Sequence, residues 1–125
     1  MQVEVSRSTD GANTFDVPVR VTNSNVGDEF LPWISISQDE QVAVTWLDRR
    51  NDPVNTKYQP FFSISDDGIN FGTSRFLSTT LSDPGLSFSY LGESRSHVWV
   101  NNTVFATWMD TRSGEPRIEL GGVQF

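Results

Sequence analysis

Two stretches of the chain carry tryptophan, aspartate and arginine at the same spacing. Residues 46–50 read Trp-Leu-Asp-Arg-Arg, and residues 108–112 read Trp-Met-Asp-Thr-Arg. An arginine guanidinium binds a carboxylate through two parallel hydrogen bonds, and an aspartate accepts hydrogen bonds from sugar hydroxyls. This chemistry would suit an acidic glycan. The alternative is structural, with each Asp and Arg paired to bridge neighbouring sheets. The residues concerned are Asp48, Arg49, Arg50, Asp110 and Arg112.

Aromatic side chains could add flat surfaces for sugar rings, and the candidates are Trp33, Tyr58 and Tyr90. Of these three, Tyr58 is included in the predicted ligand-binding set. With no cysteine and a single histidine, the chain lacks thiolate and histidine-rich metal sites, so we expect no metal and no cofactor. His97 precedes an apolar strand without a histidine or cysteine partner, which favours a structural imidazole.

The balance of charge argues against polyanionic partners. Sixteen acidic residues against nine basic ones give a formal charge of −7, and no basic run interrupts the acidic surplus. We therefore expect neither nucleic acid nor an acidic membrane surface as a partner. Residues 1–4 read Met-Gln-Val-Glu and do not resemble a signal peptide, and no apolar run is long enough to span a membrane. The location of the protein in the cell is left open.

Short strands must position these side chains. Apolar and small residues alternate along residues 42–46 and again along 104–108, as in a half-buried strand. Clusters of Asn, Asp, Gly and Pro separate the runs and mark turns. The pattern predicts an all-β meander of nine strands near residues 3–8, 17–22, 33–37, 42–46, 61–65, 75–78, 97–100, 104–108 and 118–125.

A second repeated segment lies between the strands. Residues 8–15 read Ser-Thr-Asp-Gly-Ala-Asn-Thr-Phe, and residues 64–71 read Ile-Ser-Asp-Asp-Gly-Ile-Asn-Phe. An aspartate in such a turn accepts hydrogen bonds from backbone N–H groups, glycine allows positive φ, and the aromatic ring anchors the turn. The predicted turn residues are Ser8, Asp10, Gly11 and Phe15 in the first copy and Asp66, Gly68 and Phe71 in the second.

These segments resemble the Asp-box, or BNR, repeats of sialidases and related bacterial propellers. The family pattern is Ser-x-Asp-x-Gly-x-Thr-Trp/Phe, between the third and fourth strands of a four-stranded blade. The first copy has Ala12 in place of glycine; the second has Ile64 in place of serine and Asn70 in place of threonine. The resemblance implies that the Asp boxes lie opposite the ligand face and that the Asp-Arg segments lie near the ligand-facing mouth. Related propellers are often secreted.

If the resemblance holds, residues 1–125 form one unit of about two propeller blades. Residues 1–30 supply a partial blade, 31–78 a full blade and 79–125 another partial blade. A sialidase-type propeller closes with six blades, so we expect three copies to assemble head to tail into one ring. Segments 2–6 and 118–125 both fit the third-strand position, and one of them is expected to be unpaired. The alternative is that the chain is a piece of a longer sialidase-like protein.

The resemblance to sialidases also argues against catalysis by this chain. Sialidases use three arginines, a tyrosine with a glutamate, and an acid/base aspartate, and no such set can be assembled here by motif. A ring of three copies would also repeat every group three times, whereas a sialidase pocket is asymmetric. The sequence therefore favours a non-catalytic, lectin-like glycan-binding module. A structural or protein-interaction scaffold is the second hypothesis, and a fragment of a sialidase-like glycoside hydrolase the third.

Overall fold

The computed structural model describes residues 1–86 and 95–125, and these residues form an all-β protein, as predicted. Every strand pair is antiparallel, and nine strands occupy the described part of the chain. One 3-10 turn, η1 (Pro84–Leu86), follows the sixth strand. The strands are β1 (Glu4–Val5), β2 (Val19–Arg20), β3 (Glu29–Ile36), β4 (Val42–Asp48), β5 (Gln59–Ser65), β6 (Arg75–Phe76), β7 (Ser96–Val100), β8 (Thr103–Asp110) and β9 (Arg117–Gln124).

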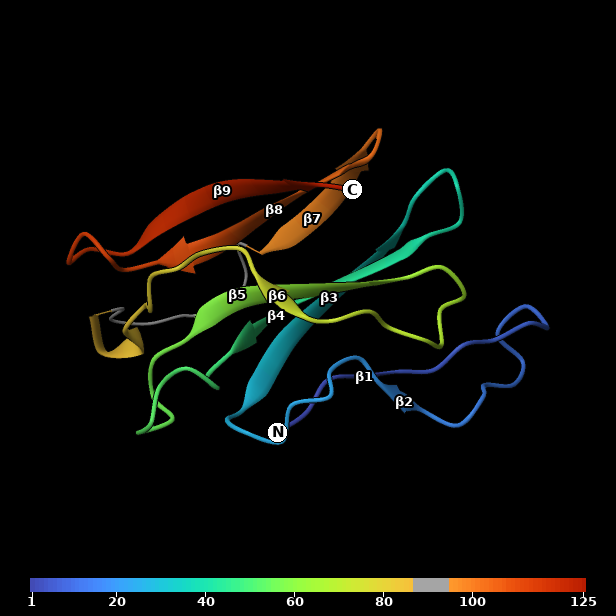
Figure 1. Ribbon diagram of the computed structural model, residues 1–125, viewed down its shortest axis with the longest axis horizontal. Coiled ribbons are helices and arrows are strands. Elements are labelled where there is room, and N and C mark those ends of the chain that lie inside the picture. Colours follow the sequence, from blue (N-terminus) through green and yellow to red (C-terminus); the bar gives the residue numbers. More distant parts are fainter. Residues whose placement is uncertain (87–94) are drawn as a thin grey trace.

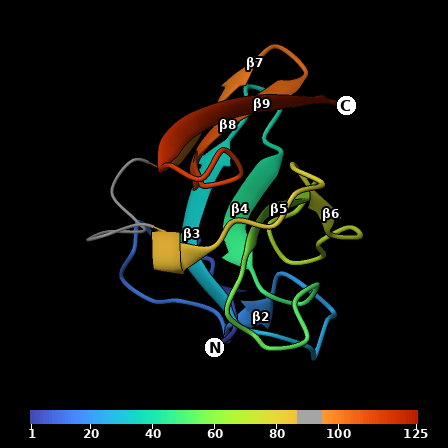
Figure 2. The same cartoon turned by 90° about the vertical axis from the view of Figure 1, so that its left-hand side faces the viewer.

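The strands form three separate sheets in chain order. The first contains β1 and β2, the second β3 to β6, and the third β7 to β9, each strand pairing with the next along the chain. Figures 1 and 2 show the sheets one after another from the N-terminal to the C-terminal part of the molecule. Both terminal strands are paired, β1 with β2 and β9 with β8, so the expectation that one of them would be unpaired is wrong.

β4 is buried along its whole length because sheets cover both of its faces. Val44 and Trp46 pack in a cluster with Val3 and Val21, which flank the first sheet. Leu47, on the opposite face, packs with Trp108 of β8. Successive side chains of a strand point to opposite sides of the sheet, so β4 contributes to both apolar layers. Two apolar clusters therefore hold the three sheets together.

A turn closed by a carboxylate connects β1 to β2. Asp10 Oδ1 accepts hydrogen bonds from the backbone N–H groups of Asn13 (3.1 Å) and Thr14 (2.9 Å), and Ser8 Oγ donates to the same oxygen at 2.9 Å. The Thr14 N–H is the main reason that the pKa of Asp10 falls to about 2. Ala12, where the repeat pattern has glycine, adopts a φ of 68°. Phe15 is 62% exposed and does not anchor this turn.

The connection from β5 to β6 forms a similar turn, but the carboxylate that closes it belongs to Asp67 rather than to the predicted Asp66. Asp67 Oδ1 accepts hydrogen bonds from the N–H groups of Ile69 (2.8 Å) and Asn70 (2.7 Å) and from Ser65 Oγ (2.9 Å). The Asn70 N–H is the main group that holds the pKa of Asp67 well below its usual value. Asp66 instead accepts from Gln41 Nε2.

The shift from Asp66 to Asp67 has a simple cause. In the first turn the carboxylate bonds N–H groups three and four residues ahead, whereas in the second it bonds those two and three residues ahead. The second turn is thus one residue shorter, and its serine is Ser65 rather than the position of Ile64. Both turns retain a glycine with positive φ, at Gly11 and Gly68. Phe71 packs against the first apolar cluster, as an anchoring ring should.

Replacing Asp67 with alanine should lower the melting temperature at least twice as much as replacing Asp66. Asp67 accepts four hydrogen bonds from the turn, whereas Asp66 accepts one, from Gln41. Thermal unfolding of the two variants, followed by far-UV circular dichroism, measures the difference. If Asp66→Ala lowered the melting temperature as much as Asp67→Ala or more, Asp66 would be the residue that closes the turn, as the sequence alignment predicts.

Candidate functional site

The two Asp-Arg segments lie at one end of the sheets, and the carboxylate-closed turns lie at the other. Asp48 ends β4 and Asp110 ends β8, so the connections that follow them lead to β5 and β9. Figure 1 shows these two connections on the left, with the β1–β2 and β5–β6 connections on the right. Each segment lies between the second and third strands of its sheet, β4 and β5 in one sheet and β8 and β9 in the next. Both segments therefore lie at the same end.

Asp48 is the centre of the first segment. Its Oδ2 accepts hydrogen bonds from Trp46 Nε1 at 2.8 Å and from Arg50 Nε at 2.9 Å, and its Oδ1 accepts from the Arg50 backbone N–H at 2.8 Å. The side chain of Asp48 is fully buried. A buried carboxylate with this many donors is satisfied within the chain. It offers no acceptor to a ligand.

Arg50 extends from this carboxylate across two further segments. Its guanidinium donates to Ser74 Oγ at 2.9 Å and to Thr22 Oγ1 at 3.0 Å, and lies 4.4 Å from the centre of the Phe61 ring. Thr22 follows β2 and Ser74 precedes β6, so Arg50 links the first sheet to the second. Its side chain is 16% exposed. The arrangement is that of a structural bridge.

Glu29 lies behind this pair and was not predicted as a site residue. Its Oε2 accepts a hydrogen bond from the Val3 N–H at 2.9 Å, and its Oε1 is 3.8 Å from a guanidinium nitrogen of both Arg20 and Arg50. Burial is the main cause that raises the pKa of Glu29, and the charge of Asp48 adds to it. No motif marks Glu29, because only packing of the first sheet against the second buries it.

The second segment repeats the geometry in a more open setting. Asp110 accepts hydrogen bonds from Trp108 Nε1 at 3.2 Å and from Arg112 Nε at 2.8 Å, and Arg112 also donates to Ser78 Oγ at 2.8 Å. Burial opposes ionisation of Asp110, but the hydrogen bonds from Arg112 outweigh it and lower the pKa of Asp110. The Arg112 side chain is 40% exposed. Of the two pairs, this one is the more accessible to a ligand.

The remaining predicted ligand residues are placed differently. Arg49 lies 4.7 Å from the centre of the Phe30 ring and 3.8 Å from Asp28 Oδ2. Tyr58 is buried, its hydroxyl donates to the Met109 carbonyl at 3.1 Å, and burial raises its pKa to about 12. Tyr58 is thus a core residue and presents no face to a ligand. Trp33 is largely exposed, and Tyr90 lies outside the described residues.

A hollow of about 440 Å³ borders Arg50 at this end of the sheets. Its polar groups already pair with one another: Asn55 Nδ2 donates to Asp28 Oδ2 at 2.8 Å, and Asp52 closes its own turn by accepting from the Thr56 and Lys57 N–H groups. Gly27, with a φ of 74°, lies so close to the Arg50 backbone that a Cβ would come within 2.5 Å of its nitrogen. The hollow carries two carboxylates, which would repel an acidic sugar.

Among residues 1–86 and 95–125, no group of three or more His, Asp or Glu side chains is placed to hold a metal ion. No helix in that same part of the chain is long and apolar enough to cross a membrane. Comparison of the chain with protein-family models, with curated proteins and with solved structures found no match.

His97 connects the second and third sheets. Its Nδ1 lies 2.9 Å from Thr45 Oγ1 of β4, and the ring is almost fully buried. Burial lowers the pKa of His97 to about 4, with a smaller contribution from the charge of Arg95. The imidazole is therefore neutral in the folded protein at neutral pH. This geometry fits the predicted structural role.

Acidification between pH 6.5 and 4 should destabilise the protein through His97. In the unfolded chain His97 takes up a proton near pH 6.5, whereas in the folded protein it does so only near pH 4. The contribution is present above pH 6.5 and is lost as the pH falls, by at most about 3 kcal/mol. Urea unfolding of wild type and His97→Gln at pH 7, 5.5 and 4.5 measures it. The variant should lose less stability across this range, and parallel curves would contradict the assignment.

Proposed function

We propose that the chain is part of a non-catalytic, sialidase-like Asp-box β-propeller and acts as a structural and interaction scaffold. Four features support the propeller. The second sheet is a four-stranded antiparallel meander, successive sheets pack through apolar faces, and Ser-x-Asp turns follow β1 and β5. β3 and β7, the first strands of two successive sheets, are in contact, as inner strands around a common axis would be.

The observation that carries the scaffold role is the saturation of Arg50. Its guanidinium bonds Asp48, Thr22 and Ser74 and covers the Phe61 ring, so the charge predicted to bind a glycan carboxylate is already paired inside the protein. The Trp-Asp-Arg unit recurs at the next sheet, as expected if its role is to join neighbouring sheets. Binding of an anion at Arg50 would first have to break these contacts.

The same geometry argues against glycosidase activity. A glycosidase needs two carboxyl groups on either side of the scissile bond, one of them with a raised pKa. Glu29 and Asp48 have these chemical properties, but their side chains are only 1% and 0% exposed. No substrate can reach them without separating the first sheet from the second. We therefore expect no hydrolysis of a fluorogenic sialoside.

Glycan binding at this end remains the second candidate, and the exposure of Arg112 favours it. A glycan array with wild type, Arg50→Ala and Arg112→Ala separates the two roles. The scaffold proposal expects no sugar to depend on either arginine, and expects Arg50→Ala to lower stability more than Arg112→Ala. Loss of a bound acidic glycan in a folded Arg112→Ala variant would establish a lectin role at this edge instead.

We further propose that copies of the chain self-associate, three to a six-bladed ring. The outer face of the third sheet is apolar and uncovered, and so is part of β3 in the second sheet. Uncovered apolar faces of this kind mark interaction surfaces. Light scattering on the purified chain should give three times the mass of one copy, whereas a monodisperse monomer would exclude the ring. The residues of the two faces are Val98, Val100, Phe105, Ile118 and Leu120, and Ile34 and Ile36.

A further inference from the structure

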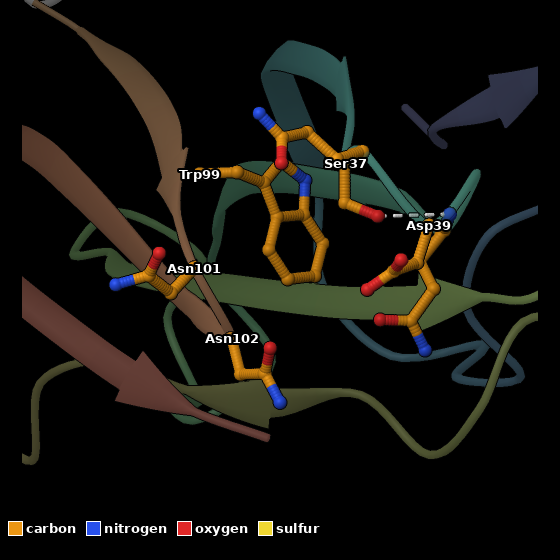
Figure 3. A pocket seen from close by; sticks show the side chains of 7 residues that line it. Ser37, Asp39, Trp99, Asn101 and Asn102 are labelled. Atoms are coloured by element: carbon orange, nitrogen blue, oxygen red, sulfur yellow. Dashed lines mark hydrogen bonds between the residues drawn. The ribbon is translucent and has the colours of Figure 1, made fainter.

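We propose that a pocket at the opposite end of the sheets binds a neutral sugar ring. The pocket has a volume of about 220 Å³ and lies between the β3–β4 turn and the β7–β8 turn. Figure 3 shows the indole of Trp99 projecting between the two turns, with polar side chains around it. The site is separate from the Asp-Arg pairs and does not depend on the scaffold proposal. Its lining residues are Ser37, Gln38, Asp39, Gln41, Trp99, Asn101 and Asn102.

The size of the pocket limits the ligand to about one ring. Clefts that hold drug-sized molecules measure roughly 300–1,000 Å³, so a volume of about 220 Å³ is too small for them. A single pyranose is a compact alternative. Larger glycans could enter only by their terminal residue.

The polar groups of the lining suit a ligand with several hydroxyls. Gln38, Asn101 and Asn102 each offer amide donors and an acceptor, and Asp39 offers two acceptor oxygens. None of these four side chains has a hydrogen-bond partner among the described residues. Hydroxyl groups act as both donor and acceptor, so a sugar can use such a mixed set, whereas an ion cannot. The arrangement therefore favours a polyhydroxylated ligand.

Trp99 adds the apolar surface that the C–H face of a pyranose needs. Its ring is held from one side by Phe125, with the ring centres 5.8 Å apart. The indole N–H is buried and has no partner in the described part of the chain. Because this N–H is enclosed, a ligand in the pocket would meet the ring rather than the donor. An aromatic face next to the amide and carboxylate groups of the lining fits a ring with one apolar face and a polar rim.

The pocket is held in place before any ligand binds. The β3–β4 turn is closed by hydrogen bonds from Ser37 N to the Gln41 carbonyl (2.8 Å) and from Gln41 N to Ser37 Oγ (3.0 Å), the second of which is drawn in Figure 3. The β7–β8 turn is tied to the C-terminal strand, because Phe125 N donates to the Asn102 carbonyl at 2.8 Å. A preformed site loses less entropy on binding.

The charge of the lining selects against acidic sugars. Asp39 is the one ionisable side chain among the described residues of the lining, and its negative charge would repel a sugar carboxylate. The preference is thus opposite to the one that the Asp-Arg segments suggested. A neutral hexose or N-acetylhexosamine is the expected ligand class.

Isothermal titration calorimetry with methyl glycosides of glucose, galactose, mannose and N-acetylglucosamine, and with sialic acid, tests the proposal. We expect millimolar binding of at least one neutral glycoside and none of sialic acid. Asp39→Ala and Trp99→Ala should weaken that binding at least tenfold, and Trp99→Phe, which keeps a ring, should weaken it less. Glu115→Ala, an exposed carboxylate at the opposite end, is the matched control and should leave it unchanged.

Several outcomes would overturn the proposal. They are the absence of binding by every neutral glycoside, a preference for sialic acid, or undiminished binding in folded Asp39→Ala. Because Asp39 is exposed and makes no contact in the core, its variant tests the site even if Trp99→Ala fails to fold. Arg112→Ala should leave this binding intact, which separates the pocket from any glycan site at the other end.

Discussion

Replacing Asp48 with alanine is expected to destabilise the protein by about 3–5 kcal/mol, because it leaves buried charge without its partner. The change removes the acceptor of Trp46 Nε1 and the main counter-charge of Arg50. Arg50 would keep only Glu29, whose oxygen is 3.8 Å away, and neutral hydroxyls. Such a loss is a large fraction of the stability of an ordinary domain, which is about 5–15 kcal/mol. Urea unfolding followed by tryptophan fluorescence measures it.

Asp110→Ala is the matched control for this effect. It removes the same contacts from Trp108 and Arg112, but the Arg112 side chain is 40% exposed, so water can solvate the guanidinium once the carboxylate is lost. We expect a cost of about 1–3 kcal/mol, near that of a buried hydrogen bond to a charged group. Equal costs for the two variants would show that burial does not distinguish the pairs, and would weaken the case for Arg50 as the stronger bridge.

Local alternation was sufficient to predict the strands. Residues 42–46 lie in β4, whose two faces are both covered. Residues 104–108 lie in β8, which has one covered face and one more open face. The all-β class follows from this period of two and from the turn residues between the runs. The sequence carried a signal that Asp67 rather than Asp66 closes the second turn, since Ser65-Asp66-Asp67-Gly68 matches Ser8-Thr9-Asp10-Gly11 without a gap. Alignment on Phe15 and Phe71 shifted the predicted aspartate by one position, because the second turn is one residue shorter.

The candidate site was predictable in its pairs but not in its surroundings. The two-residue spacing of Asp48 and Arg50 correctly suggested that they interact. Whether the pair bridges sheets or faces a ligand depends on Thr22 and Ser74, which are distant in sequence and reach Arg50 only through packing. Glu29 was missed for the same reason, since a glutamate at the start of a strand is ordinarily exposed.

Tyr58→Ala is expected to cost about 3–5 kcal/mol, the usual range for removing a large buried aromatic side chain. Tyr58 packs with Leu47 and Trp108, and its ring meets Phe30 edge to face with the centres 6.1 Å apart. It therefore fills the layer between the second and third sheets, and its loss leaves a cavity there. Tyr58→Phe keeps the ring and removes only the hydrogen bond to the Met109 carbonyl, so it should cost about 1 kcal/mol.

Trp33→Ala provides the comparison that separates a core ring from a surface ring. Trp33 is 45% exposed, and its loss should cost clearly less than that of Tyr58, although its side chain is larger. Urea unfolding of the three variants under identical conditions gives the order. If Tyr58→Ala proved as mild as Trp33→Ala, Tyr58 would have to lie at an accessible surface, and its predicted role as a stacking platform for sugars would return. A steep loss in Tyr58→Ala with a small one in Tyr58→Phe identifies the ring itself as what joins the sheets.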